Sequence, residues 1–203
     1  MGGLKQNRGT RCFLVQDDAP AKAAGLRAAL GLFVVGGVDA TSVRDIAAES
    51  GFSNPAIFKH FESKDALALC LFERCYAWMG EAFRAEAAAA GPGPEQKIAA
   101  IVACALRLIE EDREAVLYVQ ENLRRFWRGA SAETRRYSLL GQIRELVGAR
   151  GVSPEEQKLQ ASAIIGFIAQ LAREAYFDEL PAPAPEMESR ANAIVARILS
   201  LLK

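Results

Sequence analysis

The sequence predicts an all-α protein, on three kinds of observation. Apolar residues recur three and four positions apart along most of the 203 residues, and no segment of any length alternates apolar and polar residues as a strand does. Helix-start signals occur at Ser42–Asp45 and Ser153–Glu156. Helix-breaking runs of Gly and Pro occur at residues 91–94 and 181–185. With half of the residues apolar and a quarter charged, the composition is that of an ordinary globular protein with a buried core.

Bulk composition excludes several classes of protein. Lys and Arg together number 25, as do Asp and Glu, so the net charge does not indicate a nucleic-acid partner. Binding to such a partner would need a local basic face. No apolar run approaches the ~20 residues that span a bilayer, and the N-terminus lacks the apolar stretch of a secretory signal. Cys12, Cys70, Cys75 and Cys104 lack metal-site or disulfide spacing. We therefore expect a cytoplasmic protein without membrane contact.

The first helix is expected from about Pro20 to Val35. Its apolar residues, among them Leu26, Leu30 and Phe33, recur at helical spacing and form one inner face. The glycine pair that follows indicates a turn before the next helix.

Residues 41–64 carry the most informative pattern, two short helices separated by a glycine turn. Ser42–Asp45 fits a capping box, in which the serine hydroxyl and the aspartate carboxylate each accept a backbone N–H. Gly51 suits the position just past a helix end, where a positive φ is needed. Ser53–Pro55 then opens a second helix, with a capping side chain and a proline in the first turn. This is a helix-turn-helix, whose second helix can enter a DNA major groove.

The pattern resembles the DNA-binding domain of TetR-family transcriptional repressors. The likeness covers residues 22 to about 72, and the rest of the chain matches only in length and helical character. The positions that fit together are Phe33, Gly37, Thr41, Arg44–Ala47, Gly51, Ser53, Phe61 and Ser63–Lys64. The resemblance implies a helix-turn-helix DNA-binding domain at residues 19–65 and a helical effector-binding and dimerisation domain at residues 66–203.

The expected DNA-facing residues follow from this resemblance. Ile57 and Phe61, four residues apart, are predicted to face the core, which leaves the opposite side of the second helix for DNA. The implied contact residues are Thr41, Arg44, Asn54, Pro55, Ala56, Phe58, Lys59, His60 and Lys64. An Asn side chain can pair with adenine, Arg can bind guanine or phosphate through two bonds, and Lys supplies charge to phosphate.

Two features of this face depart from the family pattern. Phe58 stands where many members have Tyr, so a phosphate hydrogen bond is lost. Pro55 and Ala56 replace residues with more polar reach, so specificity is expected to depend on Asn54, Arg44 and DNA shape.

Two features near this domain have open interpretations. Residues 1–18 are expected to be a flexible arm, in which Lys5, Arg8 and Arg11 either reach a minor groove or belong to a disordered tail. The only histidine, His60, is either a DNA contact or an ordinary surface or core side chain. No second ligand lies at metal-binding spacing from it, so no metal site is expected.

The second domain is expected to consist of helices throughout. The predicted helices are residues 64 to about 90, Glu95–Glu111, Asp112–Arg128, Ser131–Val147, Ser153–Phe177 and Glu186–Leu202. Between Ala161 and Ala172 nearly every side is small or apolar, so that helix is expected to be buried all round. The final helix carries an apolar stripe. The last two helices either pair with their copies as a four-helix bundle, as in TetR-like dimers, or close the core of one chain.

The resemblance also implies a ligand pocket in this second domain. The candidate lining residues are Cys104, Tyr118, Phe126, Trp127, Tyr137, Phe167 and Gln170. The same aromatic residues could instead be core. Five arginines around Gly129 could steer an anionic ligand, flank DNA or form a solvated face.

These observations favour a homodimeric repressor that leaves a palindromic operator when a small molecule binds its C-terminal domain. A helical adaptor with weak DNA binding and a thiol-based redox sensor using Cys104 or Cys70 are the alternatives. No nucleophile elbow, phosphate loop or dinucleotide fingerprint is present in the sequence, so neither enzymatic activity nor a cofactor is expected.

Overall fold

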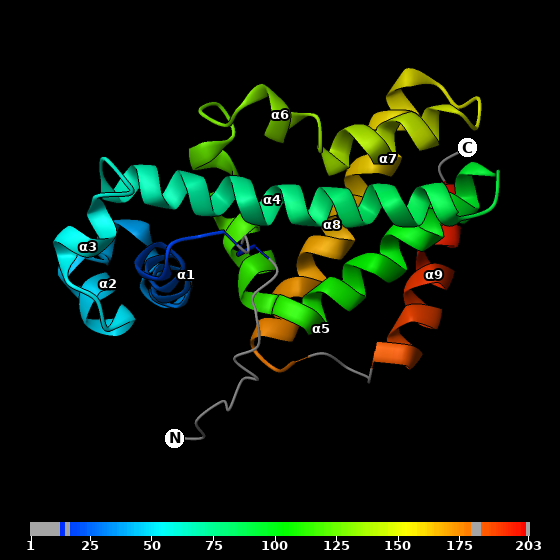
Figure 1. Ribbon diagram of the computed structural model, residues 1–203. Coiled ribbons are helices and arrows are strands. Elements are labelled where there is room, and N and C mark those ends of the chain that lie inside the picture. Colours follow the sequence, from blue (N-terminus) through cyan, green and yellow to red (C-terminus); the bar gives the residue numbers. More distant parts are fainter. Residues whose placement is uncertain (1–12, 15–16, 180–183, 202–203) are drawn as a thin grey trace. The chain divides into compact units, whose positions relative to one another are not determined.

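The computed structural model describes residues 13–14, 17–179 and 184–201, which form nine helices and no strand (Figure 1). The all-α prediction is confirmed. The chain divides into two compact units, an N-terminal unit of residues 1–74 and a C-terminal unit of residues 75–203. The division between the expected domains, after residue 65, lies near the start of a helix that both units share. Most of the expected arm, with Lys5, Arg8 and Arg11, lies outside the described residues.

The N-terminal unit consists of three helices and the beginning of a fourth. These are α1 (Pro20–Ala40), α2 (Val43–Ser50), α3 (Asn54–Phe58) and the first turns of α4 (Lys64–Ala89). Helix α1 packs against α2 and α3. Leu30 of α1, Ile46 of α2 and Ile57 of α3 are fully buried. Apolar burial at these points fixes the two short helices, which are too short to be stable alone.

Helix α1 extends beyond its expected end at Val35, to Ala40. A kink at Gly37, with φ 82° and ψ 159°, interrupts it. This φ lies in the region that favours glycine, so the bend occurs within the glycine pair at which the sequence indicates a turn. Within the described part of the chain, α1 is the one helix long and apolar enough to cross a membrane. Its buried residues pack in the core of the N-terminal unit.

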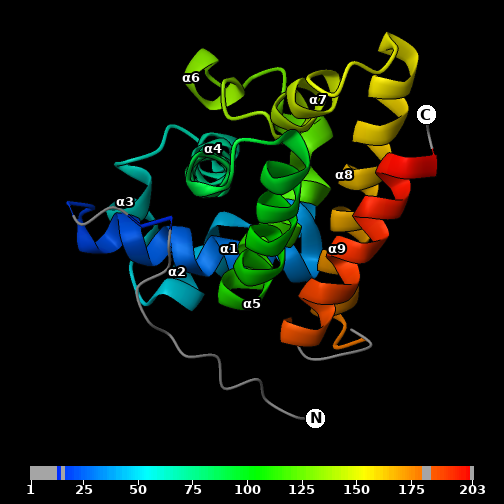
Figure 2. The same cartoon turned by 90° about the vertical axis from the view of Figure 1, so that its right-hand side faces the viewer.

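The C-terminal unit is built around one long helix. Its elements are the rest of α4, α5 (Pro94–Phe126), α6 (Ala132–Arg135), α7 (Leu139–Gly148), α8 (Pro154–Tyr176) and α9 (Ala184–Leu201). Helix α5 packs against α7, α8 and α9, and α7 also packs against α8 (Figures 1 and 2). Fully buried Ile98 and Ile101 of α5 and Ile164 of α8 belong to this core.

Helix α5 joins two helices that were predicted separately. The expected division at Asp112 is present as a kink, since Asp112 has φ −152° and ψ 75°. Its carboxylate Oδ1 accepts a hydrogen bond from the backbone N of Ala115 at 3.1 Å. Asp112 therefore caps the second half of the helix, which continues without a loop.

The prediction of one helix over Ser131–Val147 was wrong, because α6 and α7 are separate. The Ser138 hydroxyl accepts a hydrogen bond from the backbone N of Gly141 at 3.1 Å and starts α7 anew. Ser131 caps the short α6 in the same way, through the backbone N of Thr134. Side-chain bonds of serine to nearby backbone compete with helix continuation, and here they end α6 after four residues.

Helix α8 also differs from its prediction. It is not buried all round in a single chain, because Ser162, Gly166 and Gln170 are exposed on one face. At the two ends of the helix, Leu159 and Phe177 expose 53% and 64% of their surface. One face of α8 is therefore available to a partner.

Candidate nucleic-acid interface and ligand pocket

The start of the helix-turn-helix is fixed by the predicted capping box. The Ser42 hydroxyl accepts from the Asp45 backbone N at 3.2 Å, and the Asp45 carboxylate accepts from the Ser42 backbone N at 2.8 Å. These hydrogen bonds from Ser42 lower the pKa of Asp45. Gly51 ends α2 with φ 73° and ψ 11°, as a left-handed C-cap requires. The capping box and the glycine turn are therefore as predicted, but the prediction of a capping side chain at the start of α3 was wrong, because Ser53 makes no side-chain cap hydrogen bond.

Helix α3 divides into a buried face and an outer face. Ile57 is fully buried, and Phe61 just beyond the helix is 7% exposed. On the outer face Pro55 and Lys59 are exposed, and Arg44 of α2 is exposed as well. The predicted residues Asn54, Ala56, Phe58 and His60 are half-buried. The exposed cations of this unit's two short helices are thus free to meet an anionic surface.

Two of the predicted contact residues use their polar atoms inside the protein. Thr41 is 6% exposed, and its hydroxyl donates a hydrogen bond to the carbonyl of Gly37 at 2.9 Å. The Lys64 ammonium donates to the carbonyls of Asp39 at 3.2 Å and Thr41 at 2.7 Å. These bonds tie the end of α1 to the beginning of α4. Both side chains stabilise the frame that carries α2 and α3.

Asn54 and His60 each hold a buried polar atom without a partner. No hydrogen bond reaches Oδ1 of Asn54 or Nε2 of His60 from the described residues. A buried polar atom without a hydrogen-bond partner is costly, so both side chains gain if a suitable partner is brought to them. Both lie where the outer face of α3 meets the core.

Sequence reasoning missed the role of Gly25 in placing α3. A Cβ atom at Gly25 would lie 2.8 Å from Cγ2 of Ile57, which is closer than real contacts allow. Ile57 is β-branched and fully buried, so it cannot easily move aside. Gly25 therefore lets α1 and α3 approach closely. The small residues near it in the sequence, such as Ala24 and Ala28, are the hint that the sequence offers.

The beginning of α1 is tied to α4 through Asp18. Its carboxylate accepts two hydrogen bonds from the Arg74 guanidinium and one contact at 3.0 Å from the Lys22 ammonium. The Asp18 side chain is only 4% exposed, and its hydrogen bond is the main reason that the pKa of Arg74 is raised. A buried carboxylate between two cations fixes the segment just before α1 against α4.

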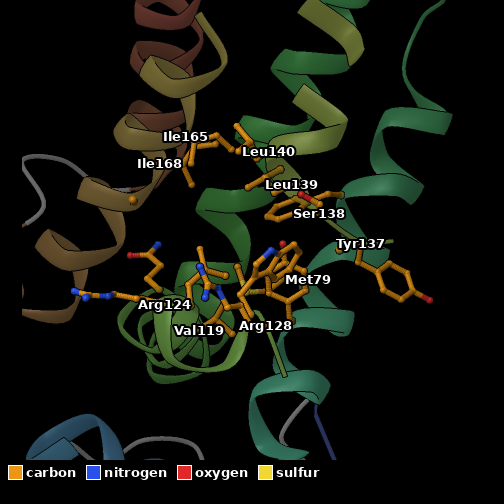
Figure 3. Close-up of a pocket in the computed structure, with 17 residues that line it drawn as sticks. Met79, Val119, Arg124, Arg128, Tyr137, Ser138, Leu139, Leu140, Ile165 and Ile168 are labelled. Atoms are coloured by element: carbon orange, nitrogen blue, oxygen red, sulfur yellow. The ribbon is translucent and has the colours of Figure 1, made fainter. Parts of the chain in front are cut away.

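The C-terminal unit contains a cavity of about 450 Å³ (Figure 3). Its lining residues are Tyr76, Met79, Gly80, Phe83, Val119, Gln120, Leu123, Arg124, Trp127, Arg128, Tyr137, Ser138, Leu139, Leu140, Ile165, Ile168 and Ala169. Of the predicted pocket residues, Trp127 and Tyr137 are among them. The volume falls in the range of small-molecule sites, about 300–1,000 Å³, and most of the lining is apolar.

The other five predicted pocket residues lie elsewhere in the unit. Tyr118 and Phe126 are buried, Phe167 is half-buried, and the exposed Gln170 amide donates to Glu174 at 3.4 Å. Cys104 is buried, and burial raises the pKa of its thiol to about 11. None of these five lines the cavity. Aromatic composition indicates a pocket in this region, but it does not show which helix face lines it.

Tyr137 lines the cavity, but its hydroxyl does not point into it. Its ring lies between the guanidinium of Arg84, 4.4 Å from the centroid, and that of Arg136, 5.2 Å away. Its hydroxyl donates to Oε1 of Glu81 at 2.9 Å and points away from the cavity in Figure 3. A Cβ on Gly80 would lie 2.4 Å from the Tyr137 Cβ, so only glycine lets α4 approach this segment.

A pair of aromatic rings forms another part of the wall. The centroids of Tyr76 and Trp127 are 5.4 Å apart and the rings are tilted by 52°. Burial raises the pKa of Tyr76, although hydrogen bonds with Leu139 and Ser138 oppose the shift. Tyr76 is therefore a neutral phenol at physiological pH, held in place by the start of α7.

Comparison with known proteins gives one family and many similar folds. Residues 26–71 match the profile described as "Bacterial regulatory proteins, tetR family". No curated protein sequence matches the chain.

Three solved structures illustrate the likeness in fold. A tetR-family bacterial regulatory protein from Rhodococcus RHA1 is 20% identical, with 90% of this chain and 98% of that chain covered and a TM-score of 0.71. A TetR-like transcriptional regulator from Rhodococcus sp. RHA1 is 21% identical, with coverages of 89% and 96% and a TM-score of 0.74. The MbdR regulator from Azoarcus sp. CIB is 21% identical, with coverages of 86% and 96% and a TM-score of 0.69. The chain thus has the fold of these TetR-like regulators, and its residues 26–71 match the model of the tetR family of bacterial regulatory proteins.

Proposed function

We propose that this protein is a homodimeric repressor that binds a palindromic operator in the cytoplasm and leaves it when a small molecule occupies the cavity. The observation that carries the proposal is the presence in one chain of a capped helix-turn-helix with exposed cations and an apolar cavity of about 450 Å³. An effector can act only through different affinities for the DNA-binding and released states.

The DNA-binding part of the proposal assigns roles by exposure. Arg44 supplies a planar guanidinium that can bind guanine or phosphate, and Lys59 supplies a positive charge to the DNA phosphates. Asn54 gains a donor for its unpartnered Oδ1 when it meets an adenine amino group. Pro55 and Ala56 offer apolar surface to thymine methyl groups. Phe58 and His60 lie beside the sugar-phosphate backbone of the DNA. Thr41 and Lys64 act indirectly, because their hydrogen bonds hold α1 and α4 in place.

The dimer is proposed to form through α8 and α9. Leu159 of α8, Phe177 just after α8 and Ile194 of α9 expose 53%, 64% and 40% of their surface. Gly166 adds a point where a Cβ would meet nothing within 4 Å in one chain. Apolar and small side chains on two neighbouring helices suit a four-helix bundle across a two-fold axis. Such symmetry would place two α3 helices on successive major grooves of a palindrome.

Fluorescence anisotropy against the DNA that flanks the protein's own gene tests the proposal. We expect saturable binding that weakens steeply with salt. Arg44→Ala should weaken it about tenfold and Lys59→Ala about threefold, with a smaller salt slope for the lysine variant. Lys158→Ala, which removes an exposed cation of the C-terminal unit, is the matched control and should bind normally.

Two alternatives predict different outcomes in the same assay. The balanced charge and Phe58 favour a helical adaptor, which would bind operator no better than random duplex even at low salt. A redox sensor would lose binding on mild peroxide treatment. The raised thiol pKa of buried Cys104 argues against that mechanism, because the reactive form is the thiolate.

A further inference from the structure

The cavity of the C-terminal unit has an uncompensated positive charge. Its 17 lining residues include Arg124 and Arg128 and no Asp or Glu. Arg124 lies in the last turn of α5 and Arg128 in the turn that follows the helix, and both are exposed at the edge of the same cavity. Among the described residues, neither guanidinium has an ion-pair or hydrogen-bond partner. Any molecule entering the cavity therefore meets two cations.

Three carboxylates near the cavity are already engaged by other groups. Glu121 pairs with Arg173 at 3.2 Å, and Glu133 pairs with Arg136 at 2.9 Å. Glu81 accepts the hydroxyl of Tyr137. None of these three carboxylates forms an ion pair with Arg124 or Arg128. The two arginines can therefore bind the anionic group of a ligand in the cavity.

The rest of the cavity requires an apolar body on that anion. Figure 3 shows Arg124 and Arg128 with Val119 on the α5 side of the cavity, and Ile165 and Leu140 on the opposite side. Other aliphatic and aromatic side chains complete the wall. A small inorganic anion would leave this surface wet, whereas an aliphatic or aromatic body gains about 25 cal/mol for each Å² that it covers.

Gln120 is a second, independent sign of a polar ligand group. It lines the cavity one turn before Arg124, and its Oε1 is buried without a hydrogen-bond partner among the described residues. Turned by 180° about its last bond, the amide directs N–H donors to the same place. An acid oxygen next to the arginines would satisfy that donor.

We propose that the effector is an amphipathic organic anion, a carboxylate or sulfonate with an aliphatic or aromatic body, whose acid group binds Arg124, Arg128 and Gln120. This assignment rests on the proposed function, in which the cavity is the effector site. It excludes amines and neutral hydrocarbons of the same size as good ligands.

Two dyes that differ by a single sulfonate test the proposal directly. Anilinonaphthalene sulfonate is anionic, phenylnaphthylamine is its neutral counterpart, and both fluoresce on entering an apolar site. We expect the dissociation constant of the anionic dye to rise about tenfold in the Arg124→Gln/Arg128→Gln double variant. That of the neutral dye should change less than about twofold. Arg125→Gln, an exposed arginine outside the lining, is the matched control.

Competition with matched ten-carbon compounds extends the test to simple ligands. Decanoate should displace both dyes and release operator DNA, and decylamine should do neither. Ala169→Trp, and the milder Ala169→Leu, narrow the cavity and should weaken both dyes, with thermal unfolding to verify that the variants are folded.

The outcomes separate this inference from the proposed function. If Ala169→Trp abolishes binding of both dyes but the arginine variant has no effect, the anion assignment is overturned while the cavity stays an effector site. If neither Ala169 variant alters dye binding or operator release, both proposals fail. If the arginine variant weakens operator binding without any ligand, Arg124 and Arg128 are DNA contacts, and the anion assignment is wrong.

Discussion

At the scale of single residues, polar atoms with and without partners separate structural from functional side chains. Thr41 and Lys64 lie at predicted DNA-contact positions, yet their polar groups bind backbone carbonyls. Asn54 and Gln120 show the reverse, because each holds a buried oxygen that no described residue satisfies. A motif identifies positions, whereas hydrogen bonds show which side chains at those positions are still available.

The capping box leads to a prediction about acid stability. The folded-state pKa of Asp45 lies below its ordinary value of 3.8, so its contribution is complete above pH 3.8 and is lost as the pH falls through the lower, folded-state value. Ser42→Ala should therefore lower the thermal unfolding temperature at pH 7. The difference from wild type should shrink below about pH 3.8, measured by circular dichroism. A difference that persists unchanged at pH 2 would show that the carboxylate is not involved.

At the scale of helices, the sequence predicts elements better than their packing. Caps and breakers set most helix ends, including the kink at Asp112, because those signals are local. The division between α6 and α7 was missed because Ser138 lies inside a sequence with good helical spacing. The cavity was only partly foreseen, with Trp127 and Tyr137, because its lining depends on how four helices are rotated toward one another. Such rotation is decided by long-range packing.

Two glycines of α1 provide a matched pair of variants. Gly25→Ala should cost about 1–3 kcal/mol by overpacking against Ile57 and should weaken operator binding, because α3 is displaced. Gly31→Ala meets nothing within 4 Å and should stabilise the protein by about 0.5–1 kcal/mol. Urea unfolding and anisotropy measure both effects. Equal stability changes for the two variants would contradict the proposed close approach of α1 and α3.

At the scale of the whole molecule, each unit contains a buried charged side chain that links segments far apart in the sequence. Asp18 and Arg74 join the ends of the N-terminal unit. In the C-terminal unit the Arg150 side chain, 9% exposed, binds Glu95 at 2.8 Å, Gln160 at 2.6 Å and the carbonyl of Leu199 at 2.7 Å. It thereby links α5, α8 and α9, the last two of which are the proposed dimer helices.

Loss of Arg150 should therefore affect stability and assembly together. Arg150→Ala removes a hydrogen-bond donor from the fully buried Gln160 and should lower the free energy of unfolding by about 2–4 kcal/mol. It should also raise the dimer dissociation constant, measured by analytical ultracentrifugation. Arg144→Ala, which removes an exposed arginine of α7, is the control and should leave both quantities unchanged.

The two faces of α3 also bear on how such a regulator diversifies. Packing is carried by Ile57 and Phe61, while Pro55 and Lys59 point outward and support no core. In the proposed repressor, substitutions on the outer face would therefore alter operator preference with little cost to folding. After gene duplication, a copy of this protein can acquire a new set of target promoters through a few outward-facing changes, and its descendants remain foldable at every step.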